Sequence, residues 1–254
     1  MWDFEHGAAG QHFEISYTLP SACARALQDG TADIGIIPAA AYASIPGLVI
    51  LPGVAIAARQ AVRSILLVSH KPLTAVKSVA MDTSSMTSVA LCKVLLEKWL
   101  GGRRDYRPMS PDLDAMLSAC DAALLIGDPA LLVDRSRYVT CLDLAEEWQR
   151  HTGKPFVFAF WAVREAALKD LDPKVNLVEI FQRSHNHGLE PANLEKIVQE
   201  WAPRLGLSKN DLKSYLTENI YYSLDEACIE GLRLYYEYAA ECGALAKAPE
   251  LRFL

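Results

Sequence analysis

The chain has 254 residues, of which 51% are hydrophobic and 22% charged, and it carries a formal net charge of −6. Its length is sufficient for one large domain or two lobes with buried cores, and the acidic balance argues against nucleic-acid binding, which needs a basic surface. The sequence contains neither an apolar run long enough to span a membrane nor a basic, apolar signal segment at its start, so we expect a cytoplasmic protein without a membrane partner.

Short apolar runs alternate with helical segments up to about residue 163, which is typical of an α/β protein with largely parallel strands. The predicted strands are Phe13–Tyr17, Ala32–Ile37, Leu48–Leu51, Ser64–Ser69, Ser78–Met81, Ala122–Ile126 and Phe156–Val163. The predicted helices between them are Ser21–Gln28, Thr87–Leu100, Pro111–Leu117, Pro129–Val133 and Leu142–His151. From Asp172 onward the periodicity is helical, so we expect a helical C-terminal segment in which the late tyrosines pack.

Two extended stretches, Arg63–Ser69 and Phe156–Val163, are each long enough to cross from one lobe to another. We therefore expect a discontinuous first lobe of residues 1–72 plus 160–254 and an inserted second lobe of residues 73–159. A small ligand would bind in the cleft between two such lobes. A single doubly wound sheet is the alternative, with its ligand at the carboxyl ends of the strands. Both arrangements place residues 82–88 at the ligand.

The segment at residues 82–88 (DTSSMTS) is a run of hydroxyl side chains between an apolar strand and a helix. The first N–H groups of that helix have no partner within the helix, and the helix dipole favours an anion beside them. We interpret the run as a cradle for the carboxylate of a small organic acid. The alternative is that Ser84 or Ser85 only caps the helix.

Other candidate positions carry both a functional and a structural interpretation. Gly127 and Asp128 follow a buried strand, where Asp128 either caps a helix or faces the ligand. Pro38 and Ala39 open a run of small residues that leaves room for a flat ligand or simply packs tightly. His151, at a helix end, is expected there because of the helix dipole, although it could act as an acid or base. The six cysteines contain no CxxC pair, and no set of residues has metal-ligand spacing, so we expect neither a metal nor another cofactor.

Four segments together resemble the chorismate dehydratases of the futalosine route to menaquinone. They are GIIPAAAYA at 35–43, DTSSMTSVAL at 82–91, ALLIGDPAL at 123–131 and LAEEWQRHTGKPFVFAFW at 144–161. The resemblance implies a type II periplasmic-binding-protein fold, with two lobes around a cleft, used as a cytoplasmic enzyme. It also implies a hydro-lyase reaction, in which chorismate loses water to give 3-[(1-carboxyvinyl)oxy]benzoate without a cofactor.

The resemblance assigns Ser84, Ser85, Thr87 and Ser88 to carboxylate binding. It places Pro38 and Ala39 in the cleft wall, and Gly127 and Asp128 at the cleft. Asp128 is the candidate catalytic group. The substrate would be the partner, and the protein a monomer or homodimer.

One departure from the family concerns the start of the chain. Family members begin with a short strand that ends in a Tyr-Leu-Asn-type motif, and its asparagine lies in the cleft. This sequence starts after that point, at a segment similar to the one that follows the motif, so we expect an N-terminally shortened version. Two other functions stay open: a solute-binding protein for a small organic acid, and the sister dihydroxynaphthoate synthase of the same pathway.

Overall fold

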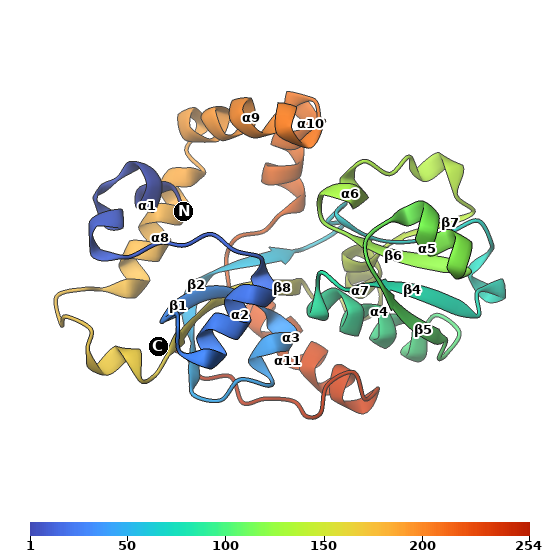
Figure 1. The fold of residues 1–254 in the computed structure, drawn as a ribbon, viewed down its shortest axis with the longest axis horizontal. Helices are drawn as coiled ribbons and strands as arrows, with labels where there is room; N and C mark the ends of the chain where they lie inside the picture. The colour runs from blue at the N-terminus through green and yellow to red at the C-terminus, as the bar shows by residue number, and fades with distance from the viewer.

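The computed structural model describes residues 1–254 apart from the side chain of Ala8. Its eight strands form two sheets, one of three strands in the order β1-β8-β2 and one of five strands in the order β5-β4-β6-β3-β7 (Figure 1). The strands are β1 (Ile34–Pro38), β2 (Leu48–Ala58), β3 (Ile65–Ser69), β4 (Ser78–Asp82), β5 (Asp105–Met109), β6 (Ala122–Ile126), β7 (Thr140–Asp143) and β8 (Phe156–Arg164).

Helices surround both sheets and make up the C-terminal part of the chain, as the sequence predicted. The helices are α1 (Trp2–His6), α2 (Pro20–Asp29), α3 (Ala39–Tyr42), α4 (Met86–Lys98), α5 (Leu113–Ala119), α6 (Asp128–Leu131), α7 (Leu144–Thr152), α8 (Leu177–Gly188), α9 (Pro191–Leu205), α10 (Lys209–Ser214) and α11 (Glu226–Glu241). A π-helical turn, Tyr215–Asn219, follows α10. Helices α4 to α7 lie around the five-stranded sheet, and α9 with α10 stands above the three-stranded sheet in Figure 1.

The largest apolar core joins the two lobes. Helix α11 packs against β8 and α4, and its Tyr235 and Tyr236 are fully buried together with Trp148 of α7. The rings of Tyr235 and Trp148 meet edge to face at a centroid distance of 6.4 Å. The prediction that the late tyrosines pack is confirmed for these two residues.

Several strand predictions were wrong. Residues 13–17 form no strand, and the strands β5 and β7 were not predicted. The expectation of largely parallel strands also fails, because only the pairs β4–β5 and β4–β6 are parallel. The return strand β8 enters the first sheet from the second lobe, so it runs opposite to both of its neighbours.

The pairing of the strands shows to which sheet each of the two predicted crossing stretches belongs. Strand β3 pairs with β6 and β7, so residues 65–69 belong to the second lobe, whereas β8 lies wholly in the first sheet. Both extended stretches form sheet strands, as predicted. We propose lobes that meet at the short links 59–64 and 153–155 in place of the predicted boundaries.

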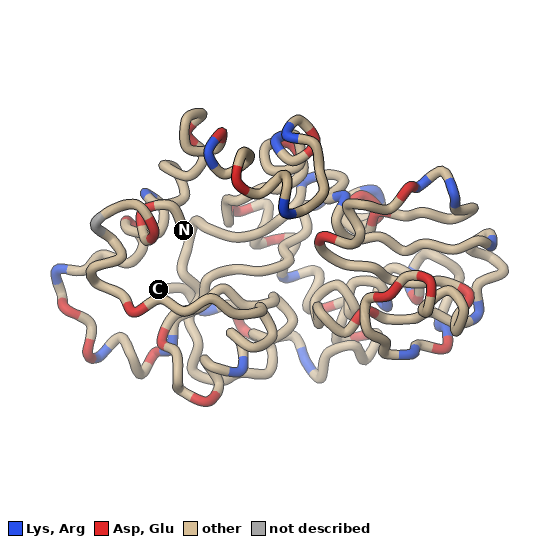
Figure 2. Tube along the Cα trace, turned by 45° about the horizontal axis from the view of Figure 1, so that its top comes forward, with Lys and Arg blue, Asp and Glu red and all other residues tan. Residues whose placement is uncertain are grey.

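Acidic and basic residues are interleaved along both lobes (Figure 2). Within the described residues, no helix combines the length and the apolar character needed to cross a bilayer.

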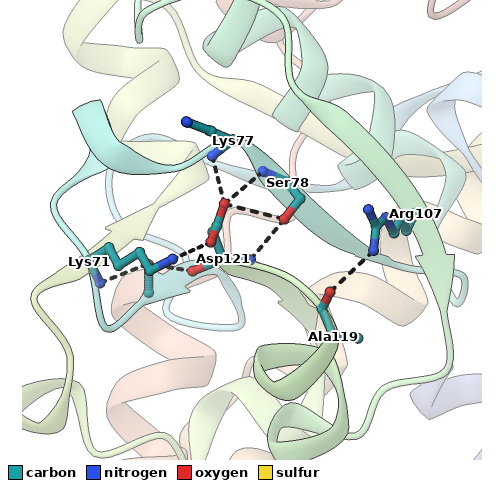
Figure 3. Close-up of polar contacts among 7 residues, drawn as sticks. Lys71, Lys77, Ser78, Arg107, Ala119 and Asp121 are labelled. Carbon is teal, nitrogen blue, oxygen red and sulfur yellow. Dashed lines mark hydrogen bonds and ion pairs between the residues drawn. The ribbon is translucent and has the colours of Figure 1, made fainter.

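The carboxylate of Asp121 holds together the edge of the second sheet where β4 and β6 begin (Figure 3). It pairs with the Lys71 ammonium and accepts the N–H groups of Lys77 at 2.9 Å and Ser78 at 3.2 Å. The Asp121 N–H in turn donates to the Ser78 hydroxyl at 3.0 Å. The hydrogen bond from Lys71 is the main cause that holds the pKa of Asp121 well below its usual range.

We expect Asp121→Asn to lower the free energy of unfolding at pH 7 by about 1–3 kcal/mol, because a charge-assisted hydrogen bond is lost. The folded-state pKa is depressed, so this stabilisation is present above the unfolded pKa and is lost as the pH falls through the folded value. Urea denaturation at pH 7 and pH 3 should show the gap between wild type and variant narrowing in acid. A gap of constant size would contradict this account.

Candidate functional site

The hydroxyl run lies where β4 ends and α4 begins, as the sequence predicted. Ser85 is the N-cap of α4: its hydroxyl accepts the Ser88 N–H at 3.3 Å and lies 3.1 Å from the Ser88 hydroxyl. The capping interpretation of Ser85 is thus confirmed. Among the hydrogen bonds of the described residues, none uses the N–H groups of Met86 and Thr87, so the start of α4 keeps free donors for an anion.

A buried carboxylate shapes this turn. Asp82, the last residue of β4, is 0% exposed and accepts the Ser84 N–H through one oxygen at 2.8 Å. Its other oxygen accepts the Ile126 N–H at 3.0 Å. Asp82 therefore ties the hydroxyl run to the end of β6. Asp82 is the first residue of the predicted motif, but its sequence position alone did not indicate this role.

The four predicted hydroxyl residues differ in accessibility. Ser84 is exposed and Ser85 half-buried, whereas Thr87 and Ser88 are buried at 0% and 1% exposure. The Thr87 hydroxyl accepts the N–H of Ala40 at 3.0 Å, which joins the starts of α4 and α3. Of the four, only Ser84 and Ser85 thus face outward, and the Thr87 hydroxyl oxygen accepts a hydrogen bond within the fold. The role of the run in carboxylate binding stays a prediction.

Pro38 and Ala39 are buried at the junction of β1 and α3. The Ala39 carbonyl accepts the Tyr236 hydroxyl at 2.6 Å, and the Thr87 carbonyl accepts the Tyr235 hydroxyl at 3.3 Å. Helix α11 thus braces the starts of α3 and α4 together. These hydrogen bonds support the packing interpretation of Pro38 and Ala39, and their role as a ligand wall stays a prediction.

Gly127 and Asp128 form the turn between β6 and α6. Gly127 has φ 75°, a backbone conformation that favours glycine, and its N–H donates to the Ser64 carbonyl at 2.7 Å. Gly127 is the N-cap of α6 and Asp128 its first residue, so the prediction that Asp128 caps this helix was wrong. Asp128 is exposed and lies two residues after Ile126, whose N–H donates to Asp82.

The sequence did not indicate that the link at residues 59–64 contacts the candidate site. Asp143, 1% exposed at the end of β7, accepts the N–H groups of Val62 at 3.1 Å and Arg63 at 2.6 Å. The Ser64 hydroxyl accepts the Tyr215 hydroxyl at 3.1 Å. These partners are separated by 80 or more residues, and no local motif signals such pairs.

His151, the candidate acid or base of the helix end, packs elsewhere. Its ring stacks on Trp99 at a centroid distance of 4.8 Å, and its Nε2 lies 3.5 Å from a carboxylate oxygen of Glu147. This supports a structural role between α7 and the end of α4.

The fold defines the class of protein. A structure from Archaeoglobus fulgidus superimposes with a TM-score of 0.67 at 20% identity, covering 91% of this chain and 86% of that one. The alkanesulfonate-binding protein of Xanthomonas axonopodis pv. citri superimposes with a TM-score of 0.61 at 16% identity, covering 93% and 83%. The protein therefore has the α/β fold of the periplasmic binding proteins.

Sequence comparison narrows the class to a family. A family model described as menaquinone biosynthesis matches residues 1–241, and the chain belongs to that family. It is 31% identical over 242 residues to a chorismate dehydratase of Thermus thermophilus, covering 89% of this chain and 86% of that protein. It is also 31% identical over 149 residues to a chorismate dehydratase of Campylobacter jejuni, covering 57% and 60%.

Proposed function

We propose that the protein is a chorismate dehydratase, a hydro-lyase of menaquinone biosynthesis by the futalosine route. The observation that carries the proposal is the 31% identity to the Thermus thermophilus enzyme over 89% of the chain. The family assignment over residues 1–241 agrees with it.

The reaction places modest demands on the protein. A ring C–H bond of chorismate breaks and its electron pair becomes part of the aromatic ring, while the ring C–O bond breaks and the oxygen leaves as water. The new aromatic ring supplies the driving force, so the enzyme has to orient a dianion and assist the transfer of one proton. The second carboxylate of the substrate could itself accept that proton.

The start of α4 offers the groups for orientation. The hydroxyls of Ser84 and Ser85 and the unused N–H groups of Met86 and Thr87 are hydrogen-bond donors at the positive end of a helix. We assign one substrate carboxylate to these groups. Asp128 is exposed in the neighbouring turn and is our candidate for a group that faces the reacting ring.

The proposal is tested by incubating the purified protein with chorismate and following the aromatic enolpyruvyl ether by chromatography and mass. Turnover supports the dehydratase. Binding of chorismate without turnover would favour a solute-binding role, and absence of both from folded protein would point to the sister dihydroxynaphthoate reaction.

The double variant Ser84→Ala/Ser85→Ala tests the assignment of the carboxylate. We expect chorismate binding to weaken by about 1–3 kcal/mol, because two hydrogen bonds to a charged group are lost. Calorimetry measures the affinity, and Ser118→Ala on the exposed face of α5 is the matched control. An affinity equal to that of the control would remove Ser84 and Ser85 from the site.

A further inference from the structure

Two side chains of the π-helical turn after α10 donate hydrogen bonds to the link between the lobes, residues 59–64. The Tyr215 hydroxyl donates to the Ser64 hydroxyl at 3.1 Å, and the Asn219 amide donates to the Ala61 carbonyl at 2.9 Å. Ser64 is 5% exposed, so its contact with Tyr215 is shielded from water. π-Helical turns occur frequently at functional positions.

Tyr215 belongs to two parts of the molecule at once. Its ring packs against a small apolar cluster of α9 and α10, built on Leu194, Val198, Ala202 and Leu212 and separate from the cores of the sheets. Its hydroxyl reaches the interlobe link. Burial raises the pKa of this hydroxyl above its ordinary value. Tyr215 therefore connects the α9–α10 pair to the crossing of the chain.

The link at residues 59–64 contains a strained backbone conformation. Arg63 lies between Ala61 and Ser64, the two residues that Asn219 and Tyr215 contact. Its φ is 67°, and it is the only non-glycine residue with a positive φ in the described chain. A side chain in this region costs free energy, which surrounding contacts must offset. The Tyr215 and Asn219 contacts, with the Asp143 carboxylate on the Arg63 N–H, supply such contacts.

Hydrogen bonds continue from the link to the hydroxyl run. The Ser64 carbonyl accepts the N–H of Gly127 at 2.7 Å. The preceding residue, Ile126, donates to Asp82, which also accepts the Ser84 N–H. These hydrogen bonds link Ser64 to Ser84 through the turn at 126–128.

We propose that Tyr215 is a positioning residue of the candidate site: its hydroxyl, through Ser64 and Gly127, fixes the turn at 126–128 and the hydroxyl run relative to the α9–α10 pair. This role goes beyond the proposed function, although the activity readout below rests on it. The geometry that carries it is the buried Tyr215–Ser64 contact followed by the Gly127 and Asp82 hydrogen bonds.

Tyr215→Phe tests the proposal, with Tyr238→Phe on α11 as the matched control, since the Tyr238 ring packs on Trp99 and its hydroxyl makes no hydrogen bond among the described residues. We expect Tyr215→Phe to lower kcat/KM for chorismate by about 5- to 10-fold and to speed amide hydrogen exchange in residues 61–64 and 126–128 by about 5-fold. Ser64→Ala should give the same changes, and the double variant should be no worse than either single one.

Two outcomes overturn the proposal. One is exchange in Tyr215→Phe that equals that of Tyr238→Phe, and the other is additivity of Tyr215→Phe and Ser64→Ala. The exchange readout needs no substrate. If the wild type does not consume chorismate, the proposed function fails, whereas faster exchange at 126–128 still supports the positioning role.

Discussion

Asp143→Ala is expected to lower the free energy of unfolding by about 3–5 kcal/mol. The carboxylate accepts four N–H groups: those of Val62 and Arg63 in the link, and those of Ala145 and Glu146 at 3.1 and 3.3 Å in the first turn of α7. Alanine would leave the buried Val62 N–H and the half-buried Arg63 N–H unpaired, at about 1–2 kcal/mol each, and remove a helix cap worth about 1 kcal/mol. Urea denaturation measures the loss.

Asp112→Ala is the control for Asp143→Ala. Asp112 is the N-cap of α5, is exposed, and accepts a single capping N–H, that of Ala115 at 3.0 Å. Its replacement should cost about 0.5–2 kcal/mol. Equal losses in the two variants would mean that Asp143 acts only as a helix cap and does not hold the link between the lobes.

Local patterns predicted the elements that local forces form. The hydroxyls after an apolar strand predicted a helix from Thr87, one residue after the observed start at Met86, because a capping side chain is read directly from the sequence. β5 escaped prediction because it is an edge strand with Arg107 and Pro108, whose charge and missing N–H are tolerated only at an edge. β7 was partly assigned to the following helix, which begins at Leu144.

The sequence did not indicate which hydroxyls of the candidate site form hydrogen bonds within the fold. Thr87 and Ser84 look equivalent in a run of small polar residues, yet Thr87 meets Ala40 across the lobes while Ser84 faces outward. That difference depends on how the two lobes pack, which the spacing of residues in the run does not report. The same holds for Tyr215 and Ser64, which lie 151 residues apart.

Asp82→Asn is expected to lower both activity and stability. One oxygen remains to accept an N–H, but the new amide group faces a second donor, so either the Ser84 or the Ile126 contact is broken. We expect a loss of about 1–3 kcal/mol in unfolding free energy. Because both partners belong to the candidate site, we also expect kcat/KM for chorismate to fall by about 10- to 100-fold, as misplaced binding groups lose transition-state contacts.

The matched control for Asp82→Asn is Asp121→Asn, the same substitution at the other end of the β4–β6 pair. Asp121 accepts the Ser78 N–H where β4 begins, whereas Asp82 accepts the Ile126 N–H where β6 ends. Both changes weaken the same pair of strands, but only Asp82 contacts the turns that carry Ser84 and Asp128. Steady-state kinetics of the two folded variants should therefore separate, with Asp121→Asn close to wild type. Equal losses of kcat/KM would show that activity follows the stability of the second sheet as a whole. The turn held by Asp82 would then not belong to the active site.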